Sequence, residues 1–285
     1  MALKVKKLSE EIIKSDVSVN RWIKELVTIW SSKCPFYHYI MENYNHGYGE
    51  MWAIVASPNS PSKTAPPHTR GIGKSVLAIK LLLTVYRDWD HAKKYLFYTP
   101  MEFVNLVKEL LDRGERIPLA VWDDAGEWLF RANFRNKFVV RVAESLEVLR
   151  TVMANLMFTA TSISKLVKAV RESTRYIITI STVASSKTFP KYKKSLARLY
   201  FNTDASEFLL RKTYPQPVAE WRFLVYLHHV IYQDYLNYRQ QYVQIAIDRV
   251  KQELDKLASQ TPKELKAQVE EAEEEFEELL KVMSP

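Results

Sequence analysis

The sequence lacks several features that would mark common classes of protein. Its 285 residues include one cysteine, Cys34, so no disulfide can form within the chain, and a reducing compartment is favoured. The six histidines are scattered, and the adjacent His228 and His229 would point to different sides of a helix, which argues against a metal site. No apolar run reaches the ~20 residues of a spanning helix, and the first residues form no secretory signal. We expect a cytoplasmic protein that binds no membrane.

Glycine is scarce as well, and half of the glycines fall beside residues of chemical interest. The chain has six glycines, whereas an average protein contains about 7% glycine. Two lie in residues 71–75, Gly-Ile-Gly-Lys-Ser, and a third, Gly126, follows the acidic pair Asp123 and Asp124. This distribution favours a ligand-binding loop near the acidic pair.

Residues 71–75, followed by the apolar run 76–83, have the pattern of a phosphate-binding loop that opens a helix. Backbone N–H groups at the helix start would wrap the phosphates, and the helix dipole would favour their negative charge. Lys74 would reach the β- and γ-phosphates, and the Ser75 hydroxyl would bind Mg²⁺. The full pattern has glycine where this chain has His68, so a chance Gly-Lys-Ser turn remains the alternative.

Two apolar segments flank the loop as strands would. Residues 51–56 precede it, and residues 117–122 lead directly into Asp123 and Asp124. A strand that ends in acidic residues about fifty positions after the lysine is where phosphate-loop enzymes hold the carboxylate that organises Mg²⁺. Without the loop, the acidic pair would indicate only a solvated turn.

Strands and helices alternate beyond the loop. The expected strands are residues 94–99, 155–161 and 176–180, and the expected helices are residues 76–83, 100–112, 139–153 and 164–172. Thr99 is the expected cap of the second helix and Gly114 its end. The order predicts an α/β fold, a parallel sheet flanked by helices, with ligands at the carboxyl ends of the strands. Lys74, Asp123 and Thr161 all fall at such ends.

We expect three parts: a helical N-terminal segment (residues 1–45), a phosphate-loop core (46–215) and a helical C-terminal extension (216–285). The first segment, with Ser18 as a helix cap, either packs on the core or forms a helix-turn-helix that reads DNA. The core contains a proline-rich insertion, residues 58–67, at the mouth of the expected site.

The C-terminal extension is expected to be helical from Val218 to its end. Aromatics crowd residues 221–242, and at helical spacing they bury in a core more often than they stack on bases. Two apolar seams then step by three and four: Val243, Ile247, Val250, Leu254 and Leu257, and later Leu265, Val269, Ala272, Phe276 and Leu279. Matching seams either fold back as a hairpin or pair between subunits, so we expect self-association.

Positive charge is unevenly distributed. The chain carries a net charge of +8, although residues 262–285 hold eight glutamates against three lysines. Residues 141–215 hold thirteen Lys and Arg against five Asp and Glu, several of them near an expected hairpin turn at residues 185–190. These charges indicate a nucleic-acid partner. The alternatives are a salt-bridged thermophilic surface and lysines that protect an edge strand.

The central part of the chain resembles the additional-strand P-loop ATPases, the group that holds the AAA+ and RecA-like proteins. Residues 69–75 match their Walker A motif, residues 121–124 match Walker B, and residues 159–162 fall where the group has a polar sensor. Within the group, the chain looks most like the DnaA/DnaC-like ATPases of archaeal viruses and plasmids. The resemblance covers about residues 50–205.

The resemblance implies ATP and Mg²⁺ as cofactors. Ser75 and Asp123 would hold Mg²⁺, Asp123 through water. Asp124 would orient or deprotonate the attacking water, and Thr161 would sense the γ-phosphate. The residues implied in binding ATP are Arg70, Gly71, Ile72, Gly73, Lys74, Ser75 and Val76.

An arginine from a neighbouring subunit is also implied, with Arg171 and Arg175 as candidates and Arg198 behind them. The chain departs from the pattern at two positions, His68 in place of the first loop glycine and Asp124 where many members have glutamate. The shorter carboxylate lies farther from the attacking water, so slow or partner-dependent hydrolysis is expected.

Three functions are compatible with these residues. The first is an ATPase that acts on DNA in replication, loading or genome handling. The second is a nucleotide-regulated assembly protein with little turnover. The third, a small-molecule kinase, is disfavoured because such kinases usually lack the acidic pair and the long helical tail.

The basic segment generates the first prediction. If it contacts a phosphate backbone, duplex DNA affinity should fall by about 0.9 log unit per log unit of salt for each neutralised phosphate. Replacing Lys191, Lys193 and Lys194 together with alanine should lower both the affinity and this slope. Fluorescence anisotropy over a salt series measures both, and absence of binding at low salt would make the charge structural.

Overall fold

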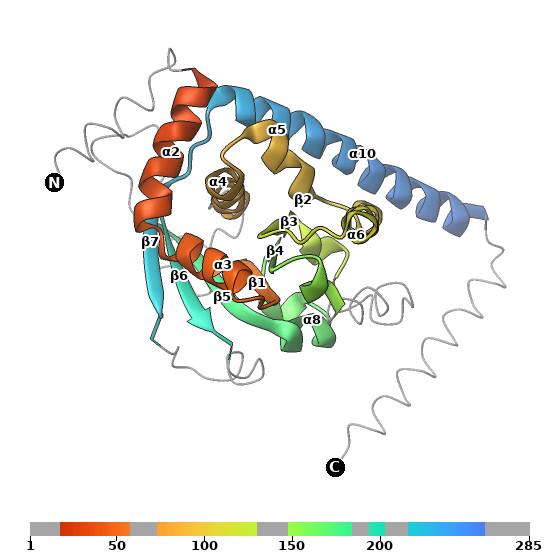
Figure 1. The fold of residues 1–285 in the computed structure, drawn as a ribbon. Helices are drawn as coiled ribbons and strands as arrows, with labels where there is room; N and C mark the ends of the chain where they lie inside the picture. Colours follow the sequence, from red (N-terminus) through yellow and green to blue (C-terminus); the bar gives the residue numbers. More distant parts are fainter. Residues whose placement is uncertain (1–17, 58–72, 130–147, 184–193, 203–215, 260–285) are drawn as a thin grey trace. The chain divides into compact units, whose positions relative to one another are not determined.

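The structure, a computed structural model, describes residues 18–57, 73–129, 148–183, 194–202 and 216–259 (Figure 1). The chain divides into two compact units, residues Met1–Gln233 and Asp234–Pro285. The expected part boundaries after residues 45 and 215 remain predictions. Within the described ranges, no helix has both the length and the apolar character needed to cross a bilayer.

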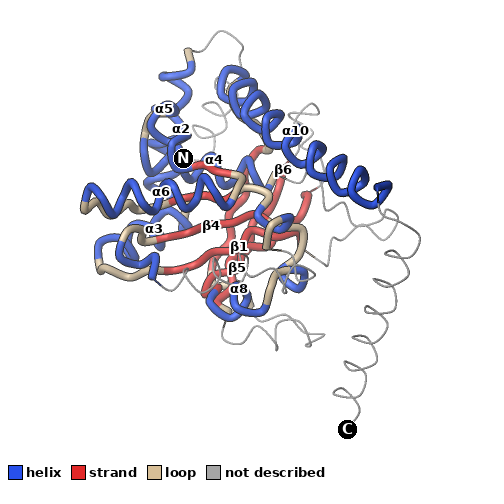
Figure 2. Tube along the Cα trace, turned by 90° about the vertical axis from the view of Figure 1, so that its right-hand side faces the viewer, coloured by secondary structure: helices blue, strands red, loops and turns tan. Residues whose placement is uncertain are grey.

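A β-sheet organises the first unit (Figure 2). Its seven strands lie in the order β2-β3-β4-β1-β5-β6-β7 (Figure 1). Its strands are β1 (Glu50–Ala56), β2 (Leu96–Phe97), β3 (Ala120–Trp122), β4 (Asn155–Thr159), β5 (Thr174–Val183), β6 (Lys194–Phe201) and β7 (Ala219–Leu224). The pairs among β1 to β5 are parallel, whereas β6 is antiparallel to both β5 and β7. β7 therefore runs parallel to β1. The expected α/β fold is confirmed, and the expected parallel sheet is parallel except at β6.

Helices flank this sheet. Their bounds are α2 (Val19–Lys33), α3 (Pro35–Asn45), α4 (Lys74–Tyr86), α5 (Trp89–Ala92), α6 (Pro100–Arg113) and α8 (Lys168–Ser173). A further helix, α10 (His229–Ser259), begins in the first unit and continues into the second. α4 packs against α2 and α3 and against strands of the sheet. The connection from β1 through α4 to β2 and the connection from β2 through α6 to β3 run in opposite directions across the sheet. Because such crossovers are right-handed, these two helices lie on opposite faces (Figure 1).

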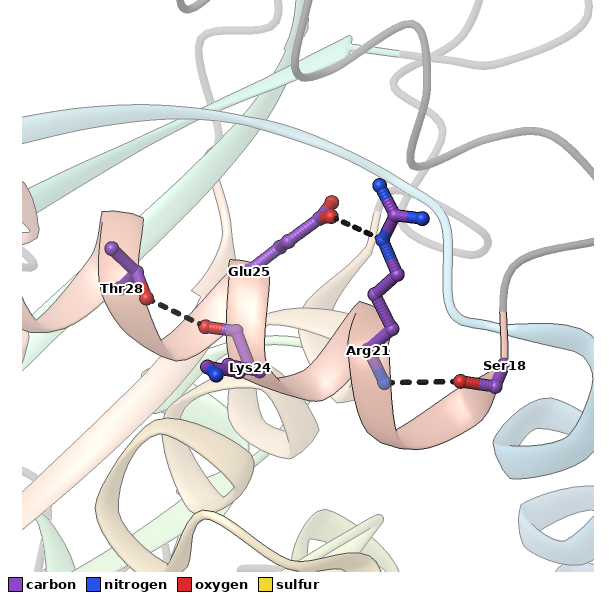
Figure 3. A network of polar contacts seen from close by, with 5 residues as sticks. All are labelled: Ser18, Arg21, Lys24, Glu25 and Thr28. Carbon is purple, nitrogen blue, oxygen red and sulfur yellow. Dashed lines mark hydrogen bonds and ion pairs between the residues drawn. The ribbon is translucent and has the colours of Figure 1, made fainter.

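The start of α2 is fixed by the cap that the sequence predicts. The Ser18 side chain accepts a hydrogen bond from the Arg21 amide at 3.4 Å (Figure 3). One turn on, Arg21 Nε lies 3.1 Å from a carboxylate oxygen of Glu25, and the Thr28 hydroxyl donates to the Lys24 carbonyl at 2.8 Å. The Ser18 cap sets where the helix begins, whereas the exposed ion pair of Arg21 and Glu25 adds little to stability.

α6 confirms a second local prediction in full. The Thr99 hydroxyl accepts the Glu102 amide at 3.2 Å, and the Glu102 carboxylate accepts the Thr99 amide at 2.8 Å. Gly114 ends the helix in the left-handed conformation with φ 61°. The helix therefore starts directly after β2, at the carboxyl edge of the sheet.

Asn155, the first residue of β4, is a buried polar hub. Its Oδ1 accepts from Asn43 Nδ2 and Trp52 Nε1, both at 2.8 Å. Its Nδ2 donates to the carbonyls of Ile40 at 2.9 Å and Pro118 at 2.8 Å. Both side-chain atoms are thus satisfied without water, and one side chain joins α3, β1 and the approach to β3.

The expectation of helix from Val218 onward is wrong at its beginning, because Ala219–Leu224 forms β7. Trp221 and Phe223 alternate with the charged Glu220 and Arg222, and the strand pairs with β6. The expected helix at residues 164–172 is shorter, a 3-10 turn at Ile163–Lys165 followed by α8. Of the helix expected at residues 139–153, the described part is a 3-10 turn at Val148–Thr151.

Several sequence expectations lie outside the described residues. They are residues 1–17 of the helical N-terminal segment, the proline-rich insertion, the hairpin turn with Lys187, Lys191 and Lys193, and the second C-terminal seam. The strands on either side of that turn, β5 and β6, do pair antiparallel as a hairpin requires.

The Asn155 hub generates a stability prediction. Asn155→Ala should lower the free energy of unfolding by about 3 to 5 kcal/mol, because buried donors and acceptors on several elements lose their partners. Asn105→Ala, at an exposed position of α6, should change it by less than about 0.5 kcal/mol. Urea unfolding followed by circular dichroism measures both, and equal effects would contradict the role of the hub.

Candidate active site

A hydroxyl and a carboxylate meet where α4 begins and β3 ends. Ser75, in the first turn of α4, donates from its Oγ to Asp123 Oδ1 at 2.9 Å. Asp123 follows the last residue of β3 and is fully buried. Its own amide donates to the Phe97 carbonyl at the end of β2, at 2.9 Å. The structure therefore brings together the two residues that the sequence analysis assigns to Mg²⁺.

Thr159, the last residue of β4, links both acids of the pair. Its hydroxyl donates to Asp123 Oδ1 at 2.6 Å and accepts the Asp124 amide at 2.9 Å. Thr159 is itself fully buried. One hydroxyl therefore fixes the carboxylate of the first acid and the backbone of the second.

Asp124 turns the chain sharply after β3. Its φ is 52°, a left-handed conformation that aspartate tolerates better than most residues. Gly126, two residues later, packs against Ala160 at the end of β4. A Cβ on Gly126 would lie 3.2 Å from the Ala160 Cβ and 3.4 Å from the Ala160 Cα. Glycine at this position lets the turn lie close to the end of β4.

Gly73 precedes α4 and is restricted in two ways. Its φ of 98° is a conformation that side-chain-bearing residues rarely adopt. A Cβ on it would lie 2.9 Å from Val225 Cγ2 and 3.2 Å from Phe223 Cε2. Its carbonyl accepts the Leu77 amide at 2.9 Å, the first turn of the helix. The carboxyl end of β7 therefore packs directly on Gly73, the last glycine of the loop.

The other expected site residues fall into three groups. Lys74 and Val76 lie in the first turn of α4 with Ser75, whereas Arg70, Gly71, Ile72 and His68 lie outside the described residues. Thr161 is exposed, two residues beyond the end of β4. Its assigned role as a sensor stays a prediction.

The candidate arginines lie away from the loop of their own chain. Arg175 lies at the amino end of β5, 3.6 Å from Glu50 at the amino end of β1, and Arg171 precedes it on α8. Arg198 on β6 pairs with Glu220 on β7 at 2.7 Å. A role of Arg171 or Arg175 at the loop therefore requires a second subunit, as the sequence analysis expects.

Thr159 is the residue that the sequence analysis missed. The family resemblance implies a polar sensor in residues 159–162 and assigns that role to Thr161. The β3–β4 register pairs Trp122 with Phe158, so the next level brings Asp123 beside Thr159. A hydroxyl that ends an apolar strand was the available signal, but choosing it requires the register between strands.

A cavity of about 450 Å³ lies elsewhere, between α5 and α6. His91, Lys94, Tyr95 and Glu115 line it, and they precede β2 and β3. It therefore opens at the amino ends of these strands, opposite Asp123, and contains none of the expected site residues.

The donor set of the site fits Mg²⁺. This ion prefers oxygen ligands and is commonly held by one or two protein groups together with substrate phosphates and water. Ser75 and Asp123 supply a hydroxyl and a carboxylate in contact. The described residues contain no group of three or more His, Cys, Asp and Glu that could hold a metal without such help.

Comparison with known proteins gives one weak similarity. No protein-family model matches the chain. A viral protein named uncharacterized protein B-251, from Sulfolobus spindle-shape virus 1, is 22% identical over 198 residues, which are 65% of this chain and 76% of that protein. An identity this low leaves the family of the chain open.

The hydroxyl of Thr159 generates a prediction. Thr159→Val should lower the free energy of unfolding by about 2 kcal/mol, because the buried Asp123 carboxylate and the Asp124 amide each lose a partner. In an Asp123→Ala background the same substitution should be less destabilising. Thr161→Val, at an exposed position, is the control. Equal losses in both backgrounds, measured by urea unfolding, would mean that the two residues do not interact.

Proposed function

We propose that this protein is a P-loop ATPase of the additional-strand group that acts on DNA in a mobile genetic element. The observation that carries the proposal is the hydrogen bond between Ser75 Oγ and Asp123 Oδ1. It joins the hydroxyl of a Gly-Lys-Ser helix start to the first acid after an inner strand. A Gly-Lys-Ser turn that occurs by chance would not be expected to hydrogen-bond to that acid.

The strand order supports the same proposal. β4 lies between β1, which leads toward the loop, and β3, which ends at Asp123. A strand inserted between these two is the additional strand from which the group takes its name. The order also brings Thr159 beside Asp123, since β4 is the neighbour of β3.

The described residues support a division of roles. Lys74 and the N–H groups of the first turn of α4 would bind and orient the phosphates. Ser75 and Asp123 would hold Mg²⁺, which neutralises charge on the phosphates when bound. Asp124 would orient the attacking water and take its proton, while Thr159 keeps the backbone of Asp124 in position.

Action on DNA rests on charge and on the similar sequence. The net charge of +8 and the excess of Lys and Arg in residues 141–215 favour a polyanion. The similarity to a viral sequence supports a mobile-element setting. Self-association would bring Arg171 or Arg175 of one chain to the loop of another, since both lie away from Lys74 in their own chain.

One observation favours the second candidate, a nucleotide-regulated assembly protein. Asp124 is one methylene shorter than the glutamate that many members of the group have, and its amide is tied to Thr159. A short carboxylate on a fixed backbone has limited reach toward an attacking water, which favours slow turnover. Measured turnover, with and without single- and double-stranded DNA, separates the two functions.

The proposal predicts distinct defects at the two ends of the site. Lys74→Ala should abolish ATP binding with the fold retained, because Lys74 is only half-buried and alanine suits the first turn of α4 at least as well as lysine does. Asp124→Asn should still bind ATP, with turnover reduced by roughly 10²-fold or more. Calorimetric titration and phosphate release measure binding and turnover.

Lys108→Ala, at an exposed position of α6, is the control and should behave as the unmodified protein does. ATP affinity that survives Lys74→Ala in a folded protein would exclude the site as a whole. Equal turnover in the unmodified protein and Asp124→Asn would exclude only the role of Asp124.

A further inference from the structure

Lys80 is a buried charged residue on the helix that follows the phosphate loop. It lies in the middle of α4 and is 5% exposed. Its Nζ donates to the Leu224 carbonyl at 2.8 Å and lies 5.7 Å from the ring centroid of Trp30. Among the described residues it has no carboxylate partner within salt-bridge distance. Burial accordingly lowers its pKa to about 7.

Burying an amine this way needs a reason, because leucine or methionine would fill the same space without desolvation. The group that the amine binds supplies this reason. Helical side chains lean toward the helix N-terminus, so the amine of Lys80 reaches back toward the start of α4. There it holds the carbonyl of Leu224, the last residue of β7.

The residue after Leu224 is the one that touches the loop. Val225 packs against Gly73 so closely that a Cβ on Gly73 would lie 2.9 Å from Val225 Cγ2 and 3.2 Å from Cγ1. Phe223, on the other side of Leu224, makes a similar approach at 3.2 Å. The carbonyl that Lys80 holds therefore lies between the two side chains that support Gly73.

We propose that Lys80 positions Gly73, the last glycine before α4, by holding the end of β7 against it. The inference rests on the proposed function, in which Gly73 and Lys74 bind phosphate. Lys80 touches no phosphate and acts through Leu224 and Val225. Without its hydrogen bond the end of β7 shifts, Val225 no longer supports the left-handed turn at Gly73, and the first turn of α4 loosens.

Amide exchange tests this directly and needs no nucleotide. The Leu77 amide is bonded to the Gly73 carbonyl, and the Arg87 amide is bonded to the Leu83 carbonyl at the far end of the same helix. In Lys80→Met, exchange at Leu77 should rise roughly five- to tenfold, the equivalent of losing one hydrogen bond, while Arg87 is unchanged. ATP affinity should fall by a similar factor.

Two further variants make the result specific. Val225→Ala should reproduce the effect of Lys80→Met, and the double variant should lose no more than either single one, because both act through the same contact. Thr84→Val removes a buried hydroxyl that bonds within α4, to the Lys80 carbonyl, and should leave exchange at Leu77 unchanged.

The outcomes separate this inference from the proposed function. Unchanged exchange at Leu77 in both Lys80→Met and Val225→Ala overturns the inference, whether or not ATP binds. Equal increases at Leu77 and Arg87 also overturn it, because they indicate general destabilisation. Faster exchange at Leu77 alone, in a protein that never binds ATP, supports the positioning role and overturns the proposed function.

Discussion

The buried carboxylate of Asp123 is the constraint on which the site depends. A charged group removed from water must be hydrogen-bonded or it destabilises the fold. The oxygen Oδ1 meets that need with the Ser75 hydroxyl from α4 and the Thr159 hydroxyl from β4. The residue's amide adds a bond to the end of β2. Three strand ends and one helix start are therefore held at fixed distances around one side chain.

β4 connects the carboxyl end of the sheet, where Asp123 lies, to the amino end. Its three middle residues are buried and apolar, whereas its first and last, Asn155 and Thr159, carry buried polar groups. Asn155 joins β4 to α3 and β1, and Thr159 joins it to the acidic pair. β4 is thus fixed in register at both ends, and a slip of one residue would leave both polar groups without partners.

What could be predicted from sequence divides by the range of the interaction. The caps at Ser18 and Thr99 depend on residues three positions away, and both are confirmed. Asp123 could be identified because it follows a buried strand. Choosing Thr159 over Thr161 depends on the register between β3 and β4, which no local pattern contains. Ala219–Leu224 was misassigned because its aromatic residues fit a helix and a strand equally well before β6 is known.

The support of Gly73 was beyond prediction for the same reason. Val225 and Gly73 meet only because β5, β6 and β7 fold back to bring the end of β7 to the carboxyl edge. Lys80 looks like an interruption of an apolar helix in sequence, and only the structure supplies the carbonyl that it binds.

The pairing of β1 has a consequence for how the protein reaches its native state. β1 lies between β4 and β5, and Trp52 bonds to Asn155, 103 residues away in sequence. Such non-local pairing slows folding, because the chain must close a long loop before any contact rewards it. On the ribosome, β1 emerges before its partners β4 and β5 have been synthesised. The apolar residues that β1 buries in the native sheet are therefore exposed during synthesis. Folding should therefore be slow, and aggregation most severe for chains that stop before β5.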